Sequence, residues 1–282
     1  MIDAGLIGTL LFLLNGLFTY KAFTDKAYMD RYIFDIDKIL IDKQYDRLLT
    51  SGFLHLNWFH FAFNMGALLA FSFSLERHLG IANFLIIYFV SLLGGNLLSL
   101  YIHRNHGDYR ALGASGAICG VILASVILFP EHSIGIPFSE ASMPSWVFAL
   151  LFVGISIIGI KKSLGNIGHD AHLGGALCGV LMTIALHPKI LANNWWIVLI
   201  IIVPTAAFLI LMIKKPQIMM IEDDWGIDLR QNINDIRHQK SQSTKEKTTY
   251  TMDYLLDKIK REGLESLTKK ERQTLDELKD KL

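Results

Sequence analysis

One apolar stretch, Leu79–Ile102, sets the fold class: LGIANFLIIYFVSLLGGNLLSLYI runs for 24 residues without an Asp, Glu, Lys or Arg. A helix of about 20 apolar residues crosses the roughly 30 Å hydrocarbon core of a bilayer. In hydrocarbon a chain must satisfy all its backbone polar groups internally, as an unbroken helix does. The stretch therefore predicts a transmembrane helix.

Working outward from this stretch, we find six further runs of 16 to 20 residues that contain none of the four charged residue types: Ala4–Tyr20, Leu56–Leu75, Ala111–Phe129, Met143–Ile160, Ala171–Leu186 and Trp195–Ile213. Each is close to the length of a membrane span, and the shortest can begin earlier, near Gly168. We predict an all-α polytopic membrane protein with a six-helix core over residues 1–190. A seventh transmembrane or interfacial helix follows over 191–215.

Charge is distributed unevenly along the 282 residues. The mean hydropathy is +0.37, and charged residues make up 19%, against about 25% in soluble domains. Up to Ile213 there are 12 Lys/Arg and 12 Asp/Glu, whereas the shorter remainder holds 15 and 14. This excludes a soluble globule for residues 1–213 and a membrane span in the tail. The net charge of +1 gives no support for a nucleic-acid partner.

The tail, residues 216–282, is predicted to be a charged linker followed by a soluble helical hairpin. Its helices are expected at Met252–Glu262 and Lys269–Lys281, with Gly263 ending the first. The sequence Thr268-Lys-Lys-Glu271 predicts a capping box. Seven apolar residues are expected to close the hairpin: Leu255, Leu256, Ile259, Leu264, Leu267, Leu275 and Leu278.

The connection Lys21–His55 is the longest between two apolar runs, and it mixes charges with large apolar side chains. A fully solvated loop does not need such side chains, so we expect this one to pack on protein or to lie at the membrane interface.

Polar side chains within apolar spans are costly, so they are the first candidates for function. The fourth run contains Leu112-Gly113-Ala114-Ser115-Gly116-Ala117. Glycines permit a tight turn before a helix, and the first N–H groups of that helix lie unpaired beside the hydroxyl. A nucleophile with an oxyanion hole needs this arrangement. Small residues at the start of a helix also serve packing alone, which is the competing interpretation.

The sixth run places His172, Gly175 and Gly179 on one helix face, at i, i+3 and i+7. Gly116 and Gly120 form a matching pair on the fourth run. Glycines at this spacing let two helix backbones come close. Packing of these two faces would bring Ser115 and His172 together, and an adjacent base is what activates a serine hydroxyl. The alternative is a hydrogen-bonded histidine in the core.

The second run places His60 and Asn64 four residues apart on one face, where both side chains can donate hydrogen bonds to a developing oxyanion. The alternative is hydrogen bonding between helices without chemistry. His55 lies just before this helix and could brace a loop.

These motifs together resemble the rhomboid intramembrane serine proteases. The second run carries His-x4-His-x3-Asn, the fourth Gly-x-Ser-Gly and the sixth Ala-His-x2-Gly-x3-Gly, in the order of that family. The resemblance covers roughly Leu6–Leu186. Tyr45-Asp46-Arg47 stands where the family often has Trp-Arg, and Leu75-Glu76-Arg77 resembles the acidic-basic end of its second helix.

The resemblance implies a Ser–His dyad on a rhomboid core. Ser115 is the expected nucleophile and His172 the general base, with the Ser115 N–H, His60 and Asn64 holding the oxyanion. Asp170 is not assigned to a triad, because side chains two apart on a helix point to different faces. Two positions depart from the family pattern: Asp46 replaces a tryptophan, and Cys119 stands where a tyrosine often lies against the histidine.

The expected function is endopeptidase cleavage within or beside the transmembrane segments of other membrane proteins. Two alternatives are a non-proteolytic client-binding or quality-control protein on the same scaffold, and a transporter that uses the polar residues as a pathway. We expect transmembrane substrate proteins and the lipid bilayer as partners, and neither metal nor cofactor. A partner for the hairpin stays open. The expected location is the plasma (inner) membrane of a bacterium, as a multi-pass protein.

Two arguments about membrane orientation disagree. The family places the serine near the outer face, with a cytoplasmic N-terminus. Counting Lys and Arg in the short connections gives the inverse orientation. We prefer the family orientation, because the six Lys/Arg of the first connection are matched by six Asp and are expected to pair within one folded unit.

Overall fold

The structure is a computed structural model that describes residues 5–135, 140–162, 168–214 and 252–279. The chain divides into two compact units, Met1–Ile221 and Glu222–Leu282, which are described separately here.

All seven apolar runs of the first unit form helices, as predicted. They are α1 (Leu6–Thr24), α5 (Trp58–Leu79), α6 (Ile81–His103), α7 (Ser115–Leu128), α8 (Ser145–Lys162), α9 (His169–Leu186) and α11 (Trp195–Lys214). Within the described residues, α1, α5, α6 and α9 are long and apolar enough to cross a membrane, while α7, α8 and α11 carry shorter apolar segments. The fold is that of an all-α polytopic membrane protein.

Helix α7 is shorter than the apolar run that predicted it. The run begins at Ala111, but residues 112–114 form a turn, and the helix starts only at Ser115. Fourteen helical residues extend about 21 Å, less than the roughly 30 Å of a hydrocarbon core. The helix that this run forms is therefore shorter than the run itself.

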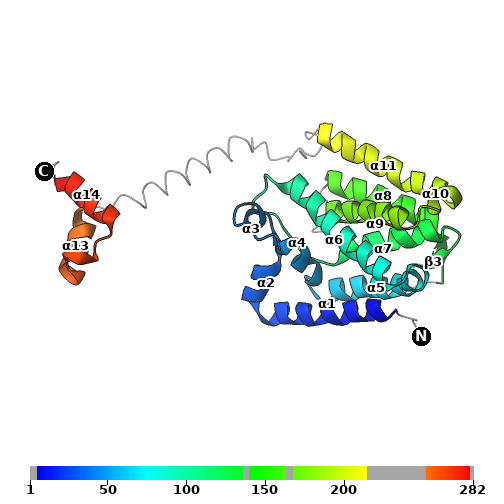
Figure 1. The fold of residues 1–282 in the computed structure, drawn as a ribbon, viewed down its shortest axis with the longest axis horizontal. Helices are drawn as coiled ribbons and strands as arrows, with labels where there is room; N and C mark the ends of the chain where they lie inside the picture. The colour runs from blue at the N-terminus through cyan, green and yellow to red at the C-terminus, as the bar shows by residue number, and fades with distance from the viewer. Residues whose placement is uncertain (1–4, 136–139, 163–167, 215–251, 280–282) are drawn as a thin grey trace. The chain divides into compact units, whose positions relative to one another are not determined.

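Helices α6, α7 and α9 pack closely on one another at the centre of the unit. Helices α1 and α5 lie to one side of them, and α8 and α11 to the other (Figure 1). Large apolar side chains remain exposed on the outer helices, as expected of surfaces that face lipid; they include Leu13, Leu17, Phe59, Phe63, Ile155 and Val203.

The first connection folds into short elements: α2 (Lys26–Tyr32), β1 (Phe34–Asp35), α3 (Ile36–Leu40), α4 (Arg47–Thr50) and η1 (Ser51–Phe53). The expectation that it packs on protein is confirmed, because Phe34, Ile36 and Ile39 form a buried cluster. Leu40 and Ile41 stay exposed. Strand β1 pairs antiparallel with β2 (Arg110–Ala111), which leads into the turn before Ser115.

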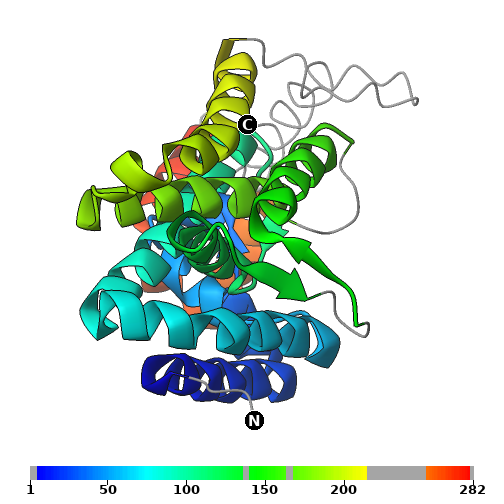
Figure 2. The same ribbon diagram turned by 90° about the vertical axis from the view of Figure 1, so that its right-hand side faces the viewer.

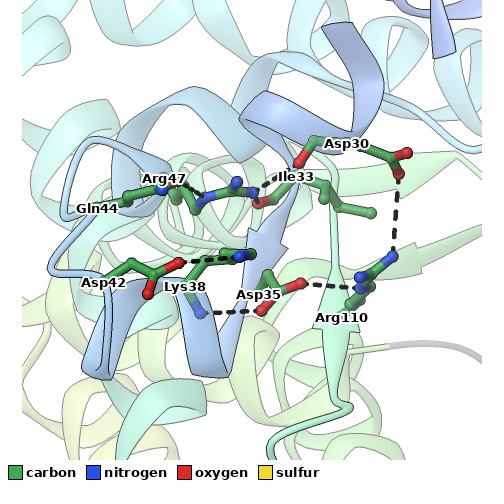
Figure 3. A network of polar contacts seen from close by, with 8 residues as sticks. All are labelled: Asp30, Ile33, Asp35, Lys38, Asp42, Gln44, Arg47 and Arg110. Atoms are coloured by element: carbon green, nitrogen blue, oxygen red, sulfur yellow. Dashed lines mark hydrogen bonds and ion pairs between the residues drawn. The ribbon is translucent and has the colours of Figure 1, made fainter. Parts of the chain in front are cut away.

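Arg47 holds this connection together from within (Figure 3). Its side chain is buried and donates to the carbonyl oxygens of Asp30 (2.9 Å) and Ile33 (2.6 Å), and to Gln44 Oε1 (2.8 Å). Asp35 accepts from the backbone N–H of Lys38 at the start of α3. These contacts join neighbouring segments into one folded unit.

Ion pairs are numerous in this region, as the matched charges predicted. They join Arg31 to Asp46, Lys38 to Asp42 and Lys21 to Asp25. Arg110, on β2, pairs with Asp35 through Nε at 2.9 Å. The Asp46 that departs from the family pattern is thus a surface ion-pair partner.

The described part of this unit also contains a pair of strands and a short helix. Strands β3 (Ser133–Gly135) and β4 (Ser142–Pro144) form an antiparallel hairpin beside α8 (Figure 2). The short helix α10 (Ile190–Asn193) precedes α11, which packs on α8 and α9.

The second unit contains α13 (Met252–Glu262), η3 (Leu264–Ser266) and α14 (Lys269–Lys279). Asp280 and Lys281, where the second helix was expected to end, lie outside the described residues. The capping box forms as predicted, since Thr268 N–H donates to Glu271 (2.8 Å) and Glu271 N–H to Thr268 Oγ1 (3.3 Å).

The apolar core of the hairpin is smaller than predicted. Leu255, Leu267 and Leu275 are buried, with Ile259 and Leu278 packed against them. Leu256 and Leu264 are exposed, because they lie on the outer side of their elements. The hydrogen bond from Lys258, together with the capping bonds from Thr268, lowers the pKa of Glu271 to about 2.

Candidate active site

Ser115 and His172 meet at the start of their helices. Ser115 is the first residue of α7, and His172 lies in the first turns of α9. His172 Nε2 is 2.7 Å from Ser115 Oγ, a hydrogen-bond distance, and both residues are half-buried. This is the spacing that proton transfer from a serine hydroxyl to an imidazole requires.

The glycine faces of α7 and α9 hold the two residues together, as their spacing predicted. A Cβ at Gly175 would overlap the Gly116 carbonyl oxygen and lie 2.7 Å from its carbonyl carbon. A Cβ at Gly179 would lie 2.7 Å from the Gly120 carbonyl oxygen. Because no side chain fits at either point, the helix backbones are in direct contact.

A second glycine pair, on α6, was missed by the sequence analysis. A Cβ at Gly95 would lie 3.3 Å from the carbonyl carbon of Ala171, the residue before His172. A Cβ at Gly174 would lie 3.1 Å from the Gly94 carbonyl oxygen. Helix α9 is therefore held between two glycine-containing faces. Gly94 and Gly95 are adjacent in a run of mostly large residues, and this feature of the sequence could have indicated a close helix contact.

The turn before Ser115 depends on Gly113. Its φ is +134°, a conformation that side chains disfavour. Its N–H donates to the Ser51 carbonyl oxygen at 3.0 Å, which ties the turn to the folded first connection. The Ser115 N–H is among the first four of α7, which lack acceptors within the helix. It is therefore available to a bound oxyanion.

His60 lies against this turn. A Cβ at Gly113 would be 3.2 Å from His60 Nε2 and 3.7 Å from Ser115 Oγ. Asn64 is buried one turn further along α5 (Trp58–Leu79), and its Nδ2 donates to the His60 carbonyl oxygen at 2.9 Å. A side-chain amide has a second N–H, which this bond leaves available. The structure thus places His60 beside Ser115, with Asn64 behind it.

His55 supports His60 from the side. It is fully buried, and Thr19 Oγ1 of α1 lies 2.9 Å from its Nδ1. Its ring packs edge-on against His60, with centroids 5.1 Å apart. Burial, with a smaller effect of His60, lowers the pKa of His55 to about 3, so the ring is neutral near pH 7. Thr19 was not singled out from the sequence, because a lone threonine in an apolar run carries no signal.

The two remaining residues of interest near the dyad are Asp170 and Cys119. Asp170 Oδ2 lies 3.3 Å from His103 Nε2 at the end of α6, so its carboxylate is directed toward α6. Cys119 is buried within the apolar cluster that also contains Leu173 and Ala176. We therefore assign neither residue as the third member of a catalytic triad with Ser115 and His172.

Comparison with known proteins shows which families the chain is similar to. A sequence model of the rhomboid domain matches residues 42–189, and one of a family of unknown function (DUF6576) matches residues 236–281. The chain is 35% identical over 137 residues to mitochondrial rhomboid protein 1 of Saccharomyces cerevisiae, covering 48% of this chain and 40% of that protein.

Two further relatives match a similar share of the chain. The human mitochondrial presenilin-associated rhomboid-like protein is 32% identical over 152 residues, which is 52% of this chain and 39% of the relative. YdcA of Bacillus subtilis, a candidate rhomboid protease, is 36% identical over 135 residues, which is 47% of this chain and 62% of the relative. The chain thus spans less than two thirds of the length of each relative.

Proposed function

We propose, from the premise that this chain belongs to the rhomboid family, that it is an intramembrane serine endopeptidase with a Ser115–His172 dyad. Members of this family are generally intramembrane serine proteases. The observation that carries the proposal is the 2.7 Å separation of His172 Nε2 and Ser115 Oγ, at the start of two helices in backbone contact.

The proposed reaction follows from these positions. Ser115 Oγ attacks the scissile carbonyl carbon while His172 Nε2 accepts the hydroxyl proton. The carbonyl oxygen, now an oxyanion, receives hydrogen bonds from the Ser115 N–H, His60 and Asn64. His172 then donates its proton to the leaving amine. In the second half of the reaction, His172 accepts a proton from a water molecule, which attacks the acyl-Ser115 ester and releases the acyl group as a carboxylic acid.

The proposed substrates are transmembrane proteins cleaved in or beside a membrane-spanning helix. A helical peptide bond is shielded by its own hydrogen bonds, so the segment must unwind before Ser115 can reach it. Glycine, proline or polar residues near the cleavage site make this unwinding easier. The short α7 supports the proposal, because a nucleophile at its start can act within the depth of the bilayer.

Labelling with a serine-reactive fluorophosphonate tests the proposal. The wild-type protein in proteoliposomes should be labelled and should cleave a reporter with an unwinding-prone transmembrane segment. Ser115→Ala should abolish labelling and cleavage. The matched control is Ser74→Ala, the same change at a half-buried position of α5, and it should leave labelling and cleavage unchanged. A wild-type protein that binds the reporter without labelling or cleavage would instead support the client-binding alternative. Proton- or solute-coupled flux without labelling would support a transporter.

Further proposals concern location and organisation. The chain belongs to an integral multi-pass membrane protein, and we place it in a bacterial plasma (inner) membrane. In support, YdcA of Bacillus subtilis is matched over 62% of its length, against 39–51% for the mitochondrial relatives. We also retain a protease core at 1–190, a seventh helix at 191–215 and a separate tail at 216–282. Membrane fractionation of the native organism tests the location.

A further inference from the structure

A buried carboxylate lies two residues before the proposed general base. Asp170 is in the first turn of α9 and is 5% exposed. Its Oδ2 lies 3.3 Å from Nε2 of His103, the last residue of α6. Burying a carboxylate is unfavourable unless it is paired, and the His103 imidazole lies within pairing distance of this one.

His103 is itself fixed by its neighbours. Its ring lies flat on the ring of Tyr109, with centroids 3.6 Å apart and planes 6° from parallel. Tyr109 packs edge-on against Phe34, and its carbonyl oxygen accepts from Ile36 N–H at 3.3 Å. Burial, followed by the Asp170 charge, raises the pKa of the Tyr109 phenol, which therefore stays protonated.

Tyr109 is also the residue that leads to the nucleophile. It directly precedes β2 (Arg110–Ala111), which is paired with β1 and continues into the Gly113 turn and Ser115. The contacts from Asp170 through His103 to Tyr109 thus connect the helix of the base to the segment that positions the nucleophile. This connection is separate from the glycine contacts between α7 and α9.

We propose that Asp170 is a positioning residue: through His103 and Tyr109 it holds the first turn of α9 in register with the segment before Ser115, and so sets the Ser115–His172 distance. The inference rests on the proposed protease function. A carboxylate–imidazole contact at this point is not required for stability, since a well-packed apolar pair is often at least as stable. The Asp170–His103 contact joins two defined positions, and it therefore specifies where the first turn of α9 lies relative to α6.

The test compares substitutions that delete the contact with substitutions that preserve it. Asp170→Ala and His103→Ala remove it. Asp170→Asn keeps a side-chain oxygen at the position that lies 3.3 Å from His103 Nε2, and His103→Gln keeps a polar side chain opposite Asp170. Asp108→Ala is the matched control, because it makes the same change at an exposed position of the same connection. The kcat and KM for a transmembrane reporter in proteoliposomes are measured together with the melting temperature.

We expect Asp170→Ala and His103→Ala each to lower kcat by about 10- to 100-fold, since a misplacement of about 1 Å can cost 100-fold. KM should stay within about twofold. The double alanine variant should be no worse than His103→Ala alone, because His103→Ala already removes both the Asp170 contact and the ring stacked on Tyr109. Asp170→Asn and His103→Gln should recover most of the lost kcat, and Asp108→Ala should match the wild type.

Three results would overturn the inference alone: an active wild type with unchanged kcat in Asp170→Ala, a loss of kcat that merely follows the melting temperature, or an Asp170→Asn variant as slow as Asp170→Ala. The last would show that charge matters rather than the contact. If Asp170→Ala does not fold, the His103→Ala and His103→Gln pair decides the same point. A wild type that neither labels nor cleaves would overturn the proposed function and this inference together.

Discussion

Replacing Gly175 by alanine should separate the proposed nucleophile from its base. The added Cβ would lie 2.7 Å from the Gly116 carbonyl carbon and 3.0 Å from its Cα, whereas carbon atoms in contact prefer about 3.5 to 4.0 Å. Both partners are helix backbone and cannot rotate away, so α7 and α9 must move apart by about 1 Å. The Ser115–His172 hydrogen bond, 2.7 Å long, would then exceed hydrogen-bond reach.

Catalytic geometry tolerates about 0.5 Å of displacement, and an error of about 1 Å can lower the rate 100-fold. We therefore expect kcat for a transmembrane reporter to fall by about 100-fold in Gly175→Ala. Gly154→Ala on α8 is the control, because a Cβ there meets nothing within 4 Å. Reporter cleavage in proteoliposomes and fluorophosphonate labelling are measured on protein that extracts and melts normally. A Gly175→Ala enzyme with the wild-type rate would refute the close-contact argument.

Three further outcomes are expected. Ser115→Ala and His172→Ala should each abolish reporter cleavage, with the double variant no worse than either, whereas His60→Ala should lower kcat by about 100-fold; full activity in His172→Ala would exclude the dyad. The pKa of Glu271 is held at about 2, below its ordinary 4.5, so the stabilisation of the hairpin by this carboxylate should be complete above about pH 4.5 and should decline as the pH falls toward 2. Amide hydrogen exchange of residues 252–279 in the full chain, corrected for intrinsic rates, should show this decline. Glu271→Gln should remove the pH dependence. A stop codon after Pro216 should leave cleavage intact, because every candidate catalytic residue precedes it; a stable but inactive truncation would contradict this, and protease accessibility of the full-length tail would report its side of the membrane.

The amino-acid sequence determined the helices and the identity of the candidate residues. Charges are excluded from seven runs, and because a bilayer cannot solvate the backbone, most of each run forms a helix. The Thr268–Glu271 capping box was likewise readable, because its hydrogen bonds join residues three apart. Ser115 and His172 stood out because polar groups are rare in such runs.

The facing glycines show where local pattern also predicted tertiary contact. Two glycine pairs, Gly116 with Gly120 and Gly175 with Gly179, each place small residues on one face of a helix. The sequence therefore predicted that these two faces would meet. It did not reveal that Gly95 packs beside Ala171, because a glycine pair in one run does not say which helix approaches it. The α6 contact is a property of the three-helix arrangement.

Only the tertiary structure decided how far apart the candidate residues lie and what supports them. The start of α7 at Ser115 depends on the Gly113 turn, which is held by the Ser51 carbonyl from a distant connection. The partner of Asp170 is His103, 67 positions earlier in the chain. Spacing along one helix shows which face a side chain occupies, but the partner across that face is set by how separate helices pack, and a single sequence does not contain that distance.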